Sequence, residues 1–315
     1  MKSLQLSYKR NQHYIHLAVL FWALHLVFLS SKLLADPKID EIPIHVLKKQ
    51  NTKTGPDQTW DSKQLSTLEF QDQSRQLRRY LYDFQYGKAY EYKAINLFEW
   101  LMSHKLPAHV NTANLVFQNG MIIPMPLNSS QGPLVWLAWH FRQSPKESWQ
   151  REFPIIEKPS DQWRDPRPLV FQGNKLIVSN QRFFPRPEWD ISDDFSPFKH
   201  TNSLLRIDLV DYNEWNQQFF VSSLAAALRG QKIFTDRCQF CHSVWGAGAK
   251  YGWDFTDPLP VYQQRTAQSL LYHVKYPKNH ALERGLMMPT QNGLEAGEAE
   301  DLWQWMREAY HWRQP

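Results

Sequence analysis

Cysteine is scarce in this chain of 315 residues. Only two cysteines occur, Cys238 and Cys241, and two residues separate them. A disulfide between such close neighbours would close a very small ring, and the stabilisation that a disulfide provides grows with the length of the loop it closes. A structural disulfide is therefore a poor explanation, and the pair needs a chemical one.

The chain also lacks a dense stripe of lysine and arginine that would neutralise phosphates, which argues against nucleic-acid binding. The net charge is +5, but residues 1–35 hold four basic residues and no acid, so the remainder carries only +1 (5 − 4). No internal repeat or low-complexity tract occurs. No hydrolytic or acid–base constellation stands out, so we assign no catalytic residue.

The N-terminal run from Leu17 to Leu29 is apolar except for His25 and is 13 residues long. A membrane-spanning helix needs about 20. Three basic residues lie upstream, and a small residue, Ala35, follows before a plausible cleavage point. This pattern predicts that residues 1–35 are a cleaved export signal, which places the protein in the periplasm. An uncleaved membrane anchor is the alternative, and a buried N-terminal helix fits poorly with the basic flank.

The length predicts two domains, at about 150 residues each. Residues 36–73 are polar, with few periodic apolar positions, and are expected to form an extended arm. Residues 74–213 are expected to form a mixed α+β domain rich in strands, because prolines clustered between Pro124 and Pro197 favour turns and edge strands over long helices.

Local patterns predict several elements of this first domain. Apolar runs on both sides of an Asn-Gly pair predict a hairpin over residues 115–127, and the same pattern around a Gly-Asn pair predicts a second over 169–178. Residues 95–104 predict a short helix capped by Asn96, and residues 204–210 alternate like a half-buried strand.

From residue 220 to residue 315 the pattern is helical throughout. Three helices are expected, over 223–238 with Ser222 or Ser223 as its cap, over 265–276, and over 294–312. The third has acids in its first turns, which is favourable at the positive end of the helix dipole. Its apolar stripe consists of Leu302, Trp305, Met306 and Ala309.

The two cysteines belong to the motif Cys-Gln-Phe-Cys-His, which ends at His242 and is the attachment signature of c-type haem. Two thiols one helical turn apart can add to the two vinyl groups on one porphyrin edge, and the next imidazole then stands beneath the iron. A thioredoxin-like redox pair would need a preceding βαβ pattern, whereas an alanine-rich helix precedes this motif. A zinc site would need a fourth ligand, such as His273 or His280. A chance match is the remaining alternative.

The segment from 220 to 312 resembles the class I cytochrome c family. The matching features are Gly230 and Phe234 in the first helix, the attachment motif, a Met-Pro pair at Met288, and a last helix that crosses the first in that family. The resemblance implies one covalent haem c held by Cys238 and Cys241, with His242 as the proximal iron ligand and Met288 as the distal one. Met287, His273 and His280 are the alternatives for the distal position, since imidazole also ligates haem iron.

One feature departs from that family. A proline carbonyl often accepts the Nδ1 proton of the proximal histidine there, and such bonds fix the orientation and basicity of the ring. This chain has Trp253 at the proline position, between Gly252 and Asp254. Another loop carbonyl is a candidate for the proton, and Trp253 itself either walls the haem crevice or packs in the core.

The first domain weakly resembles the molybdopterin-binding domain of the sulfite oxidase type. The phrases that carry the resemblance are YKAINLFEWLMSHKLP, a strand pair with NGM and IPMPL, LVWLAWHF and SPFKHTNSLLRIDLV. That family holds its metal through a cysteine thiolate, and residues 74–213 contain no cysteine. The resemblance therefore implies a docking or scaffold module without the metal chemistry.

These features together predict a periplasmic c-type cytochrome that transfers single electrons. Its first domain would dock a redox protein partner, such as a dehydrogenase or an oxidase of a respiratory chain. Its N-terminal segment would allow the protein to associate with a membrane. An oxidoreductase is the alternative, in which the first domain binds a small substrate or a pterin and the haem is the electron outlet. A third possibility, haem-based sensing or peroxide chemistry, requires Met288 to leave the iron.

Overall fold

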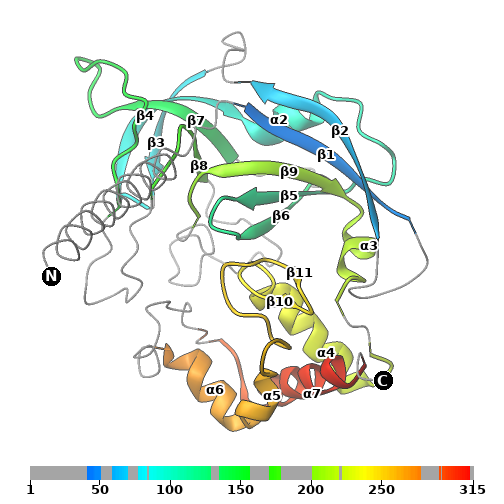
Figure 1. The fold of residues 1–315 in the computed structure, drawn as a ribbon. Coiled ribbons are helices and arrows are strands. Elements are labelled where there is room, and N and C mark those ends of the chain that lie inside the picture. The colour runs from blue at the N-terminus through cyan, green and yellow to red at the C-terminus, as the bar shows by residue number, and fades with distance from the viewer. Residues whose placement is uncertain are drawn as a thin grey trace, which may run out of the picture. The chain divides into compact units, whose positions relative to one another are not determined.

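The fold is known from a computed structural model, in which two β-sheets are followed by a group of helices (Figure 1). The structure describes residues 41–50, 59–69, 77–83, 85–128, 135–156, 170–178, 201–219, 222–277, 291 and 293–312. The predicted signal or anchor over residues 1–35 lies outside the described residues, as do Met287, Met288 and His280.

The first sheet has five strands in the order β2-β1-β9-β5-β6. They are β1 (Glu41–Lys49), β2 (Trp60–Glu69), β5 (Thr112–Phe117), β6 (Ile122–Pro126) and β9 (Leu204–Val210). Strands β1 and β9 run parallel, and the other neighbours are antiparallel. The predicted hairpin over residues 115–127 is confirmed as β5 and β6, with Gly120 at a φ of 88° in the turn. The predicted strand over residues 204–210 is confirmed as β9.

The prediction of a separate extended arm over residues 36–73 is wrong for the described part of that segment. Strands β1 and β2 pair with each other, and β1 also pairs with β9 inside the sheet. Ile42 and Ile44 of β1 are fully buried, whereas most of β2 is exposed at the sheet edge. An edge strand needs little apolar surface, so the polar composition of β2 gave no sign in the sequence that it is a strand.

The second sheet has four antiparallel strands in the order β3-β4-β7-β8. They are β3 (Leu77–Asp83), β4 (Lys88–Asn96), β7 (Val135–Arg142) and β8 (Lys175–Val178). The hairpin predicted over residues 169–178 is wrong. Gly173 does form a turn, with a φ of 82°, but β8 pairs with β7 rather than with the residues just before it. The turn is a local property, whereas the partner of a strand is chosen by packing.

One apolar core contains side chains from both sheets. The first sheet contributes Leu115 and Ile207 and the second contributes Leu137 and Leu176, all at most 5% exposed. The short helix α2 (Leu97–Met102) adds Leu97 and Leu101 to this core. Its predicted cap is confirmed, because the Asn96 side chain accepts a hydrogen bond from the Glu99 amide.

In the C-terminal region, the described residues form helices, connecting loops and two strands of two residues each, β10 (Ser243–Val244) and β11 (Ala247–Gly248). Its helices are α4 (Ala225–Ile233), α5 (Val261–Gln264), α6 (Ala267–Lys275) and α7 (Ala296–Trp312), and α3 (Tyr212–Asn216) precedes them. The three predicted helices are confirmed with shorter bounds. The predicted serine cap is wrong, because Leu224 occupies the cap position of α4 and makes no side-chain capping bond.

Helices α4 and α7 cross at Gly230. A Cβ atom at Gly230 would lie 2.1 Å from the Asp301 carbonyl oxygen and 2.7 Å from Cβ of Trp305, so the two helix backbones are in direct contact. The predicted apolar stripe of α7 is confirmed, since Leu302, Trp305, Met306 and Ala309 are all at most 2% exposed. The contact between α4 and α7 thus organises the C-terminal region.

A strand-rich region therefore precedes a helical one, as predicted. The two regions are nevertheless in contact with each other, and Ile39–Pro315 forms one compact unit. None of the helices in the described residues combines the length and the apolar character needed to cross a bilayer.

Candidate haem-binding site

The attachment motif follows a change of helix type. Helix α4 passes into a single π-helical turn, Phe234–Cys238, which the sequence analysis did not predict. π-Helical turns inside α-helices occur frequently at functional sites. The chain then returns to α-helical bonding, because the His242 amide donates to the Cys238 carbonyl at 2.9 Å. Cys238 and Cys241 consequently lie on the same side of one turn, and both are partly exposed.

Both thiols lie in apolar surroundings. Burial raises the pKa of Cys238 and of Cys241 to about 12, so that both are protonated at neutral pH. Redox-active Cys-x-x-Cys pairs have a lowered thiol pKa, because the thiolate is the reactive form. The surroundings of this pair therefore argue against a thioredoxin-like function.

The zinc alternative gains no support from the described part of the chain. In that part, no group of three or more His, Cys, Asp or Glu side chains is arranged to hold a metal ion. Of the two histidines considered as a fourth ligand, only His273, in α6, is described.

The imidazole of His242 is held by a backbone carbonyl. Its Nδ1 lies 2.7 Å from the carbonyl oxygen of Trp253 and donates to it. Burial lowers the pKa of His242, and this hydrogen bond opposes the shift. The ring is therefore neutral at pH 7, with its proton on Nδ1 and the Nε2 lone pair left for a metal ion. The acceptor is the residue at the expected proline position, and because every residue has a carbonyl, proline is not needed there.

Gly252 provides the space for this ring. A Cβ atom at Gly252 would lie 2.6 Å from Cε1 and 2.8 Å from Nδ1 of His242. The Gly252 amide also donates to the Cys241 carbonyl at 2.6 Å. The backbone at Gly252 thus lies directly against the imidazole, a contact that the sequence analysis missed. The available signal was a glycine immediately before the residue at the proline position.

The carboxylate of Asp254 fixes the loop beside Trp253. It accepts hydrogen bonds from the Ser243 hydroxyl and from the amides of Trp245, Gly246 and Thr256. Burial alone would raise the pKa of Asp254, but the hydrogen bonds outweigh it and hold this pKa below the usual value. Because Asp254 follows Trp253 directly, these bonds also hold the carbonyl that orients His242.

Aromatic rings pack behind this site. Phe255 lies 4.8 Å from the His242 ring, centroid to centroid, and also contacts Phe234, which packs on Trp305 of α7. The Trp253 side chain is 49% exposed, so the expectation that it packs in the core is wrong. The site therefore has an apolar back, formed by the π-helical turn, α7 and the loop.

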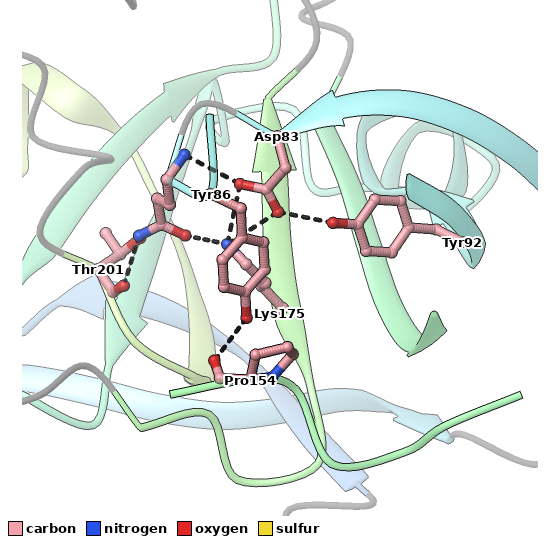
Figure 2. Close-up of polar contacts among 7 residues, drawn as sticks. Asp83, Tyr86, Tyr92, Pro154, Lys175 and Thr201 are labelled. Atoms are coloured by element: carbon pink, nitrogen blue, oxygen red, sulfur yellow. Dashed lines mark hydrogen bonds and ion pairs between the residues drawn. The ribbon is translucent and has the colours of Figure 1, made fainter. Parts of the chain in front are cut away.

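A second polar cluster, which the sequence analysis missed, lies in the strand-rich region (Figure 2). Lys175 of β8 is fully buried, and its Nζ lies 3.1 Å from Asp83 Oδ2. The ammonium also donates to the side chain of Gln85 and lies 4.7 Å from the centre of the Tyr86 ring. Burial lowers the pKa of Lys175, and the Asp83 carboxylate opposes that shift.

The other polar atoms of this cluster are also paired. Tyr92 donates to Asp83 Oδ2 at 2.8 Å, and the Tyr86 hydroxyl donates to the Pro154 carbonyl at 2.8 Å (Figure 2). Gln85 donates to the Thr201 carbonyl at 2.9 Å. A fully buried ion pair with these partners joins β3, β4 and β8, so we assign the cluster a structural role.

Comparisons with known proteins agree with the chemistry of the haem-attachment motif and its loop. The cytochrome c family model matches residues 227–309, which include the motif, the loop at Trp253 and most of α7. No curated protein and no solved structure matches the chain. The family match does not reach residues 74–213, where the likeness to molybdopterin-binding domains stays a prediction. Residues 227–309 therefore form a cytochrome c domain, which brings a covalently bound haem c and a haem-based function in electron transfer.

Proposed function

We propose that the protein is an exported, periplasmic carrier of single electrons. Cys238 and Cys241 form the thioether bonds to the haem, His242 is the proximal ligand and Met288 the distal one. The observation that carries this proposal is the hydrogen bond from His242 Nδ1 to the Trp253 carbonyl, directly after a turn that places both thiols on one side. The basic flank and short apolar run of residues 1–35 support export, by a cleaved signal or an uncleaved anchor.

The haem supplies a one-electron couple, and backbone groups of the protein hold its proximal ligand in place. The Trp253 carbonyl holds the His242 ring in one orientation and tautomer, and it raises the basicity of Nε2. Gly252 lets the loop backbone approach that ring. A thioether at the distal position is a soft ligand that raises the reduction potential and occupies the site that an exogenous ligand would need.

The first test uses the exported protein. We expect the haem to stay with the polypeptide in acidified organic solvent, and to be lost in a variant with Cys238→Ala and Cys241→Ala. Met288→Ala should abolish the weak sulfur-to-iron charge-transfer band of the oxidised protein, whereas the neighbouring variant Met287→Ala should keep it. The opposite pattern would show that Met287 is the ligand, and extraction of the haem from the unaltered protein would end the proposal.

The strand-rich region carries a surface that supports a docking role. Arg78, Lys93 and Arg142 share one side of the second sheet, and their charged groups lie 5.9, 5.0 and 4.5 Å from the centre of the Trp149 ring. Tyr80, on the same side, is 69% exposed. We call these five residues the cationic face. Tyrosine, tryptophan and arginine are the residues that dominate protein–protein interfaces, and a positive face attracts an acidic partner.

Charge reversal tests this role. Glu91 already pairs with Arg142 at 2.7 Å, so Arg78 and Lys93 are the cations to change. We expect a redox partner that co-purifies with the native protein at low salt to be lost from the Arg78→Glu, Lys93→Glu variant. The variant Lys48→Glu, Lys63→Glu makes the same charge change on exposed residues of β1 and β2 and should retain the partner. Equal retention by both variants would refute docking at the cationic face.

A further inference from the structure

The turn between β5 and β6 contacts the segment that carries the attachment motif. The Lys250 amide donates to the Gly120 carbonyl at 2.8 Å, and the Ile122 amide donates to the Phe240 carbonyl at 3.1 Å. These two backbone bonds join the strand-rich region to the cytochrome c domain within one compact unit. Phe240 lies between the two cysteines of the motif.

The backbone of this turn lies close to the backbone of the loop. A Cβ atom at Gly120 would lie 3.0 Å from the Lys250 carbonyl carbon and 3.3 Å from the Tyr251 amide nitrogen. Both are backbone atoms, which cannot swing aside as the end of a side chain can. A residue larger than glycine must therefore displace the turn or the loop by a few tenths of an ångström.

The two residues between the cysteines are buried. Gln239 is fully buried, and its side-chain amide donates to the Tyr212 hydroxyl of α3 at 2.9 Å and also to the Thr235 carbonyl. Phe240 is 2% exposed, and Cys241 and Tyr251 pack against the core that the two sheets share. The side of the motif between its cysteines is thus covered by protein.

The contact continues to His242 through a short run of backbone. Lys250 and Tyr251 immediately precede Gly252, whose backbone lies against the His242 ring, and Trp253, whose carbonyl accepts a hydrogen bond from His242 Nδ1. A displacement of the loop at Lys250 therefore reaches the orientation of the imidazole. Exclusion of water and hydrogen bonding to the axial ligand are two of the means by which a protein sets a haem potential.

We propose that the β5–β6 turn is a positioning element for the haem. It covers the porphyrin edge at which Cys238 and Cys241 are attached, and it holds the loop that orients His242. The strand-rich region thereby raises the reduction potential of the haem, because an apolar cover disfavours the extra positive charge of ferric iron. This inference rests on the attachment proposed above.

The test compares two glycine variants of the full-length, haem-loaded protein. Gly120→Ala and Gly87→Ala each place a Cβ atom on a backbone with positive φ, 88° and 66°, so both carry the same kind of strain. A Cβ atom at Gly87 meets nothing within 4 Å, whereas one at Gly120 meets the loop. We expect Gly120→Ala alone to lower the reduction potential. We also expect it to speed amide exchange at Lys250 and Ile122 by about tenfold or more.

Two results would overturn the inference. One is an unchanged potential in Gly120→Ala, and the other is an equal shift in both variants. If Gly120→Ala does not fold, Gly120→Asn takes its place, since asparagine tolerates a positive φ and its Cβ atom meets the same loop backbone. A lowered potential in Gly120→Asn then supports the inference, and an unchanged one refutes it. If the unaltered protein holds no thioether-bound haem, the proposed function fails instead, which distinguishes the two failures.

Discussion

Lys175→Met is expected to lower the free energy of unfolding by about 3–5 kcal/mol, the usual cost of removing one partner from a buried ion pair. Methionine retains most of the apolar volume of lysine, so the effect comes from the charge left behind. The Asp83 carboxylate, 2% exposed, would keep the hydrogen bonds from Tyr92 and from the Gln85 amide but would lose its cation. Denaturant unfolding followed by tryptophan fluorescence measures the loss.

A double variant separates charge from packing. Lys175→Met combined with Asp83→Asn removes both charges, and we expect it to recover most of the stability lost in Lys175→Met. Lys63→Met, at an exposed position of β2, is the matched surface control and should change stability by no more than about 0.5 kcal/mol. A loss in Lys175→Met no larger than in this control would show that the buried pair contributes nothing.

Elements specified by neighbouring residues could be predicted from the sequence. The hairpin of β5 and β6 depends on the glycine at position 120, and the start of α2 depends on the side chain of Asn96, which caps it. The buried stripe of α7 follows from helical spacing alone. In each case the residues that decide the structure lie within a few positions of one another.

Features that depend on distant partners could not be predicted. The turn before β8 suggested a hairpin, but β8 pairs with β7. Side chains of both strands, such as Leu137 and Leu176, pack in the same apolar core. Lys175 begins the apolar strand β8 after a polar turn, so its burial has no local signal, and its partner Asp83 lies 92 positions away. Nothing local to β1 indicates that it lies parallel to β9.

The candidate site likewise has a part that could be predicted from the sequence and a part that could not. The motif from Cys238 to His242 is contiguous, so its chemistry could be predicted directly. The bond from His242 to the Trp253 carbonyl could not, because a backbone acceptor leaves no trace in the residue type. The turn at Gly120 was predicted as a hairpin, yet its contact with Lys250 appears only in the folded protein.

Gly230→Ala is expected to destabilise the cytochrome c domain by about 3 kcal/mol, near the upper end of the usual cost of overpacking. Helix propensity acts in the opposite direction, because alanine is favoured over glycine in a helix by about 1 kcal/mol. The contact prevails because the new Cβ atom would lie 2.1 Å from the Asp301 carbonyl oxygen, a backbone atom of α7. Helices α4 and α7 must then separate, and Trp305 would lose its packing on Phe234.

Gly297→Ala provides the matched control for this variant. Gly297 also lies in a helix, α7, but a Cβ atom there would meet nothing within 4 Å. We expect this variant to be unchanged or up to about 1 kcal/mol more stable, since only propensity acts on it. Thermal unfolding, followed by haem absorbance and by circular dichroism, should rank Gly297→Ala at or above the unaltered protein and Gly230→Ala well below it. If Gly230→Ala melted at as high a temperature as the control, α4 and α7 would have space for a Cβ atom where they cross. The close contact between these two helices would then not exist in solution.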